Sequence, residues 1–194
     1  KISHNTEKIW LALCRLEVHC NNFEKAKIIM ENARDKCNTD KIWLHSCKLL
    51  RQLNGGGSDQ ELNLELIAVS KFKSFDKLWM MLIQCYEQRG EYKKCCEIAE
   101  KSLRFCNNSI NLWLEYIRIL SSKLRKYAKA RSILQNATLQ HPKQDILWLT
   151  AARLELEENY SRDRKPGDMI NRTQAGYAQC KSLIAKGLQQ CADS

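Results

Sequence analysis

Tryptophan recurs along this chain at a nearly constant interval. The five tryptophans are Trp10, Trp43, Trp79, Trp113 and Trp148, and the gaps between them are 33, 36, 34 and 35 residues. Each lies in an apolar triplet such as Ile9-Trp10-Leu11. A fixed period of about 20 to 50 residues marks a repeat array, in which each unit is too small to bury its own apolar face and stacks on its neighbours.

The first repeat indicates that the repeating unit is a pair of helices. Residues 7–19 are apolar on more than one side, Asn21-Asn22 interrupts them, and residues 23–37 carry apolar side chains at the i, i+3, i+4, i+7 spacing of an amphipathic helix. The chain contains only two prolines and seven glycines, which suits helices. We therefore predict an all-α fold, an α-solenoid of about five helix–turn–helix repeats in a right-handed superhelix.

The period divides a single array into repeats at about residues 7–40, 41–74, 75–107, 108–142 and 143–194. Asp40 is predicted to cap the next helix, and Gly90 is predicted to end one. Residues 54–58 are predicted to form a flexible turn, and the polar segment 157–172, which contains Pro166-Gly167, an inserted surface loop. Because the chain ends at the close of a repeat, we expect it to be a fragment of a longer protein.

Small residues recur seven positions apart on the second helix of several repeats. Two helical turns separate such residues, so they lie on one face, and we predict that each tryptophan packs against them as a wedge in a socket. The predicted repeat signature comprises the five tryptophans with Ala26, Ala33, Ala68, Ala99, Ala130 and Ala137. In the second repeat, the apolar face of this helix is assigned to Leu62, Leu66, Val69 and Phe72.

The sequence carries no motif that predicts catalysis or a cofactor. The ten cysteines include no C-x-x-C pair, and we expect them to pack in the core of a protein from a reducing compartment rather than to bind a metal. The glycines at 55–57 lack the lysine and the strand of a P-loop. No apolar run is long enough for a membrane span. We therefore predict a non-enzymatic protein with no metal, no cofactor and no membrane segment.

The net charge of +10 leaves two interpretations open. The 32 basic residues are mixed with 22 acidic ones, so most of the charge can simply solvate helix surfaces. Alternatively, a basic surface attracts RNA or an acidic protein. The densest basic group, and the predicted contact site for such a partner, is Arg125, Lys126, Lys129 and Arg131.

The spacing around the tryptophans resembles the half-a-tetratricopeptide (HAT) repeat. Trp10 is followed by Leu16-Glu17 and Trp148 by Leu154-Glu155, and the Gly–Tyr pair of the tetratricopeptide repeat is absent. HAT repeats occur in scaffolds for splicing, mRNA 3′-end formation and ribosomal RNA maturation. Residues 7–12, 77–81 and 185–191 are also similar to the C-terminal repeats of a bridging protein of the spliceosomal tri-snRNP.

This resemblance implies a nuclear, non-catalytic scaffold that binds spliceosomal snRNP proteins. The alternative is an RNA-binding HAT module in another RNA-processing complex. Arrays of stacked repeats also expose apolar faces at their ends unless capping repeats cover them, so we expect some self-association through the array ends.

Overall fold

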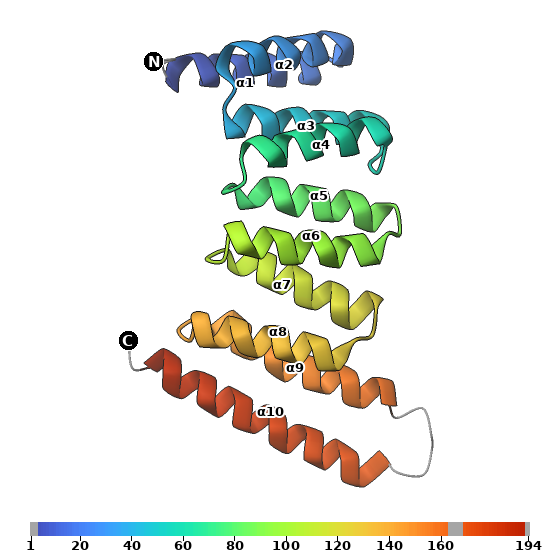
Figure 1. Ribbon diagram of the computed structural model, residues 1–194, viewed down its shortest axis with the longest axis vertical. Helices are drawn as coiled ribbons and strands as arrows, with labels where there is room; N and C mark the ends of the chain where they lie inside the picture. Colours follow the sequence, from blue (N-terminus) through green and yellow to red (C-terminus); the bar gives the residue numbers. More distant parts are fainter. Residues whose placement is uncertain (1–3, 163–168, 193–194) are drawn as a thin grey trace. The chain divides into compact units, whose positions relative to one another are not determined.

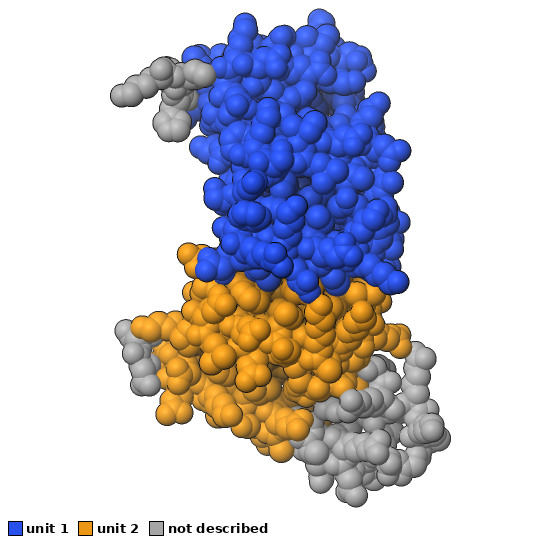
Figure 2. All heavy atoms as spheres, viewed as in Figure 1, with its two compact units in different colours: residues 1–107 blue, residues 108–194 orange. Residues whose placement is uncertain are grey.

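All regular secondary structure in the described residues is helical, as the sequence predicts (Figure 1). The computed structural model describes residues 4–162 and 169–192. Residues 1–107 and 108–194 form two compact units, which Figure 2 shows in different colours. The first unit contains α1 (His4–His19), α2 (Phe23–Cys37), α3 (Asp40–Asn54), α4 (Asp59–Lys71), α5 (Asp76–Gln88) and α6 (Tyr92–Phe105). The second contains α7 (Ile110–Arg118), the π-helical turn η1 (Ile119–Lys123), α8 (Tyr127–Gln140), α9 (Asp145–Arg162) and α10 (Met169–Ala192).

Some helices begin after a polar cap, and some are followed by a residue with a left-handed backbone. Thr39 caps α3, since its backbone is extended and its hydroxyl accepts the Ile42 N–H at 3.4 Å. The prediction that Asp40 is the cap is wrong by one position, because Asp40 is already the first helical residue. The prediction for Gly90 is confirmed, since α5 ends at Gln88 and Gly90 has a φ of +74°. Glycine adopts a positive φ at little cost in free energy, because it has no Cβ atom.

Several tryptophans are tied through the indole N–H to the linker that precedes their own helix. Trp43 Nε1 donates to Asn38 Oδ1 at 2.9 Å, and Trp79 Nε1 donates to the Lys73 carbonyl at 2.7 Å. Trp148 Nε1 donates to the Pro142 carbonyl at 2.9 Å. A buried indole N–H needs such an acceptor, so the repeating tryptophan fixes the turn between hairpins as well as the core.

Cysteine side chains occupy equivalent positions near the ends of two hairpins. Cys106 Sγ donates to the Lys73 carbonyl at 3.3 Å, and Cys191 Sγ donates to the Lys143 carbonyl at 3.6 Å. In both cases the end of a hairpin is bonded to the linker at its beginning. Cys180 Sγ likewise donates to the Ala152 carbonyl at 3.3 Å. Burial raises the pKa of the Cys106 and Cys180 thiols, so both stay protonated and can donate these hydrogen bonds.

Two parts of the sequence interpretation differ from the structure. The predicted loop 157–172 is helical at both ends, because α9 continues to Arg162 and α10 begins at Met169, while residues 163–168 lie outside the described residues. On α4 the predicted apolar face is also wrong in part. Leu66 is exposed, whereas Glu61 and Glu65 are fully buried beside Ala68 and Val69.

Trp148 of α9 packs directly against Gly187 of α10, and this contact predicts the effect of a substitution at Gly187. A Cβ atom at Gly187 would lie 2.7 Å from Trp148 Cβ and 2.8 Å from its Cγ. Alanine normally stabilises a helix by about 0.5–1 kcal/mol relative to glycine. Here we expect Gly187→Ala to lower the free energy of unfolding by about 1–3 kcal/mol, because the overpacked helix must move away from the indole.

Urea denaturation measures this effect. The control is Gln189→Ala on the exposed side of α10, which should change stability by no more than about 0.5 kcal/mol. A Gly187→Ala protein more stable than the parent would show that the wedge and socket do not touch as described.

Candidate functional site

A groove opens in the first unit over α3, between α2 and α4, which are the second helices of two successive hairpins. Its volume is about 370 Å³. The floor is apolar and the rim is polar, so the groove can take an apolar side chain of a partner and bond to its backbone. The lining residues are Lys27, Met30, Glu31 and Arg34 of α2, Ser46, Leu49, Leu50 and Leu53 of α3, and Gln60, Asn63, Leu64 and Ile67 of α4.

The second unit contains a groove at the equivalent place, between α8 and α10 over α9, also of about 370 Å³. Its lining residues are Arg131, Leu134, Gln135, Thr138 and Leu139 of α8, Trp148, Ala151, Leu154 and Glu155 of α9, and Leu183 and Lys186 of α10. The first four α8 residues have the same i, i+3, i+4, i+7 spacing as the four α2 residues. The two grooves are therefore one feature of the repeat, formed twice.

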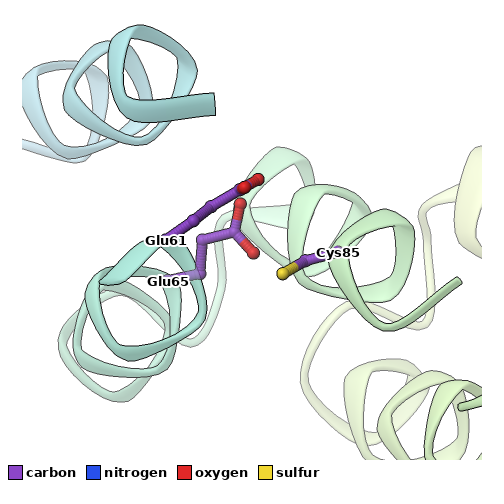
Figure 3. A group of neighbouring side chains, drawn as sticks. All are labelled: Glu61, Glu65 and Cys85. Atoms are coloured by element: carbon purple, nitrogen blue, oxygen red, sulfur yellow. The ribbon is translucent and has the colours of Figure 1, made fainter. Parts of the chain in front are cut away.

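A charged cluster lies in the core of the first unit, where α3, α4 and α5 meet. Arg51 of α3 donates through Nε to Glu61 Oε1 at 2.5 Å and through Nη2 to Glu65 Oε1 at 3.0 Å. Both carboxylates come from α4, are fully buried, and point toward Cys85 of α5 (Figure 3). Arg51 also donates to Gln84 Oε1 and to the Met81 carbonyl, each at 2.8 Å, so one side chain joins three helices.

Glu61, Glu65 and Cys85 each offer an atom within 4.8 Å of the others, which is a spacing that metal sites use. Arg51 and the Gly57 N–H, however, already bond to both Glu61 oxygens, and Arg51 bonds to one oxygen of Glu65. Only Glu65 Oε2 and the Cys85 thiol remain, fewer than the three or four protein ligands of a zinc site. Burial and the two carboxylates raise the pKa of the Cys85 thiol to about 12. Because Arg51 already supplies a positive charge, the cluster is better suited to holding a proton on one of its carboxylates than to binding a divalent cation.

Glu65 is the group that carries this proton. Its Oε2 atom is buried and has no hydrogen-bond partner in the structure. Burial is the largest influence and raises the pKa of Glu65, Arg51 opposes the shift, and the nearby Glu61 carboxylate adds to it, so that the pKa lies at about 8. A neutral Glu65 leaves one carboxylate to balance one guanidinium, so the buried cluster has no net charge at neutral pH.

The raised pKa of Glu65 predicts how stability depends on pH. The folded chain binds one proton more than the unfolded chain between pH 4.5 and about 8. The stabilisation is therefore complete below pH 4.5, decreases as the pH rises, and is lost by about pH 8, with a limiting slope of about 1.4 kcal/mol per pH unit. Glu65→Gln cannot ionise, so it should remove this part of the pH dependence.

The measurement is urea denaturation of the parent and Glu65→Gln between pH 5 and pH 8.5. The control Glu97→Gln, at an exposed position on α6, should follow the parent profile. Parallel profiles for the parent and Glu65→Gln would show that Glu65 is ionised in the folded chain throughout this range.

The predicted basic contact group is divided by the structure. Arg125, Lys126 and Lys129 are exposed around the start of α8, and the Lys129 ammonium lies 5.8 Å from the centre of the Tyr116 ring. Arg131 instead forms ion pairs with Glu155, at 2.5 Å, and with the buried Glu158. Arg131 is thus already bonded within its unit, and the exposed part of the basic group is the segment 125–129.

The sequence did not lead us to predict the ion pairs of Arg51 with Glu61 and Glu65, or those of Arg131 with Glu155 and Glu158. Helices α2 and α4 can be aligned on a small residue that both carry, Ala33 in α2 and Ala68 in α4. In this alignment Glu61 takes the position of Ala26, seven residues earlier, and Glu65 takes the position of Met30, three residues earlier. Carboxylates at two core positions of a periodic pattern are a signal that they are paired inside the protein. Alignment of the repeats with one another could have found them.

Comparison with known proteins agrees with this architecture. The tetratricopeptide repeat family matches residues 76–119. The fold is that of a tetratricopeptide-type repeat protein. Among solved structures, the MamA protein superposes with a TM-score of 0.60 at 8% identity, covering 97% of this chain and 93% of its own. A tetratricopeptide repeat protein from Parabacteroides merdae gives 0.55 at 15% identity, covering 99% and 80%. At these identities the likeness concerns the fold alone.

One curated relative and one further solved structure complete the comparison. The pre-mRNA-splicing factor prp1 of Schizosaccharomyces pombe is 29% identical over 124 residues, which is 64% of this chain but only 12% of that protein. YrrB, described as a tetratricopeptide repeat protein with an unusual peptide-binding site, superposes with a TM-score of 0.53 at 12% identity, covering 95% of this chain and 86% of its own. Among the helices of the described residues, none is long and apolar enough to cross a membrane.

Proposed function

We propose that this chain is a non-catalytic scaffold that binds other proteins during pre-mRNA splicing. The observation that carries the proposal is the pair of equivalent grooves, because an apolar floor with a polar rim, repeated along a helical array, suits an extended partner segment. The splicing context is supported by the 29% identity with the splicing factor prp1.

A finer assignment follows from the short motifs. Residues 7–12, 77–81 and 185–191 resemble the C-terminal repeats of pre-mRNA-processing factor six, which bridges components of the spliceosomal tri-snRNP. On this proposal the partners are snRNP proteins and the location is the nucleus. The spacing of the tryptophans, without the Gly–Tyr pair, supports the HAT variety of the repeat.

RNA binding is the second candidate, and one observation favours it. Arg125, Lys126 and Lys129 are exposed together on a chain of net charge +10. Contacts to phosphates release counterions, so binding by this segment would weaken steeply as salt rises. Binding of an apolar anchor in a groove depends far less on salt.

The experiment is affinity capture from nuclear extract, with half of the sample treated with ribonuclease. We expect the same splicing proteins in both halves, since the grooves bind protein. If the bound proteins disappear after ribonuclease treatment, the chain contacts them through RNA, and the segment 125–129 becomes the binding surface.

A further inference from the structure

The first helices of the hairpins in the first unit carry exposed basic residues in two rows on one face. Counted from the repeating tryptophan, one row lies two residues before it and the other lies five residues after it. The rows are seven residues apart, so two helical turns separate them and they share a face. Helix α1 contacts α3, and α3 contacts α5. We call these residues the basic strip: Lys8 and Arg15 of α1, Lys41 and Lys48 of α3, and Lys77 of α5.

The positive charge of the second row is compensated in the second unit but not in the first. Arg118 pairs with the glutamate three residues before it at 2.7 Å, and Arg153 pairs with the glutamate four residues after it at 3.2 Å. Arg15 and Lys48 have no acidic residue three or four positions away on their helices. Lys48 also belongs to an inner hairpin, and its equivalent Arg153 is 65% exposed, so this face is open along the array.

His45 marks the place where two helices direct this charge at one point. Its imidazole is half-buried, and burial is the first cause that lowers its pKa. The charges of Lys48 on its own helix and of Arg15 on α1 lower the pKa further, and Glu7 of α1 opposes the shift. Glu7 is itself buried and pairs with Lys41 at 3.6 Å. The contacts of the described residues therefore give Arg15 and Lys48 no carboxylate partner.

The residues between the two rows indicate what kind of anion suits the strip. Leu11, Leu44 and Met80 each follow the first row by three positions, and Leu11 and Met80 are half-buried. These aliphatic side chains can contact apolar side chains of a peptide. They offer no aromatic ring on which a nucleic-acid base could stack, as single-stranded RNA needs. The strip is therefore better suited to the carboxylates of a protein than to RNA.

We propose that the basic strip binds an acidic segment of a partner protein, with carboxylates of that segment beside Arg15 and Lys48. The strip shares no residue with the groove over α3, so it is a second binding surface of the first unit. A carboxylate bound beside His45 favours the protonated imidazole, so binding should raise the pKa of His45. Affinity should therefore increase as the pH falls from 7.5 to 6, a range in which aspartate and glutamate stay ionised.

Fluorescence anisotropy of the whole chain with a labelled decapeptide of glutamate tests the proposal. We expect Arg15→Glu with Lys48→Glu to weaken binding by about tenfold or more at physiological ionic strength, because both cations beside His45 become anions. The matched control is Lys93→Glu with Lys101→Glu, two exposed positions on α6. It makes the same change in net charge and should lose little affinity, since salt screens distant charges. His45→Gln should bind at pH 7.5 and lose the gain in affinity at pH 6.

Three results would overturn the proposal. One is a parent chain that does not bind the peptide, and another is equal weakening in both double variants, which would mean that net charge alone attracts it. A third is tighter binding of a ten-nucleotide oligouridine than of the peptide, abolished by Arg15→Glu with Lys48→Glu, which would make the strip an RNA surface. A gain in affinity at pH 6 that persists in His45→Gln would likewise place the carboxylates elsewhere. None of these outcomes bears on whether the grooves bind splicing proteins.

Discussion

Replacing Arg51 by alanine should lower the free energy of unfolding by about 3–5 kcal/mol, because it leaves the buried Glu61 carboxylate without its cation and Glu65 without its hydrogen-bond donor. Glu61 and Glu65 are both fully buried, and Arg51 is the one guanidinium that the described contacts place on them. The same substitution also removes the bonds to Gln84 and to the Met81 carbonyl, which connect α3 to α5. Urea denaturation at pH 7 gives the value directly.

The matched control for Arg51→Ala is Arg153→Ala. Arg153 pairs with Glu157 four residues away on the surface of α9, and its side chain is 65% exposed. An exposed pair of this kind contributes only about 0.3–0.5 kcal/mol. If the two substitutions cost the same, the Arg51 cluster is solvated rather than buried. Adding Glu61→Gln to Arg51→Ala should restore part of the loss, since it removes an unpaired buried charge.

Replacing Trp79 by alanine should cost roughly 3–5 kcal/mol, the usual range for deleting a buried aromatic side chain. Trp79 is 1% exposed and stacks with Phe105, with 5.9 Å between ring centroids. Its indole also bonds to the Lys73 carbonyl, so the deletion both leaves a cavity and frees the linker between α4 and α5. The midpoint of urea denaturation should fall while its slope stays unchanged.

Two comparisons separate the cavity from the hydrogen bond. Trp79→Phe keeps the six-membered ring and loses the five-membered ring with its N–H donor, so it leaves a smaller cavity and should cost much less than Trp79→Ala. Trp148→Ala, at a half-buried position, should also cost less than Trp79→Ala. Equal losses at Trp79 and Trp148 would contradict the view that burial of the wedge determines its contribution.

The fold could be predicted because the tryptophan period and the helical periodicity give the same answer. The spacing of residues 23–37 alone predicts a helix, and α2 has those bounds. The C-terminal end of α9 and the N-terminal end of α10 were not predicted, because the polar residues on both sides of Pro166-Gly167 indicate a loop. A helix can nevertheless continue through a polar sequence. Helix propensity alone cannot decide between these outcomes.

The candidate site was less predictable, since it depends on which residues of different repeats meet. The basic group at 125–131 is contiguous in sequence, yet the structure separates Arg131, bonded to Glu155 and Glu158, from its exposed neighbours. The grooves are formed by residues from three helices, none of which is unusual by itself. Their equivalence becomes visible only when the contacts of both units are compared.

The central claim, that the grooves hold a protein partner, is tested most directly by capture from nuclear extract with groove variants. Ile67→Glu and Leu139→Glu each put a charge into one groove at an exposed position, 47% and 72% exposed, where folding should be unaffected. Leu156→Glu, exposed on α9 outside both grooves, is the control, and Arg125→Glu with Lys126→Glu removes the basic segment. Our account predicts that the double groove variant loses the captured splicing proteins, whereas the control and the basic-segment variant keep them. Retention by the groove variant together with loss by the basic-segment variant would contradict it.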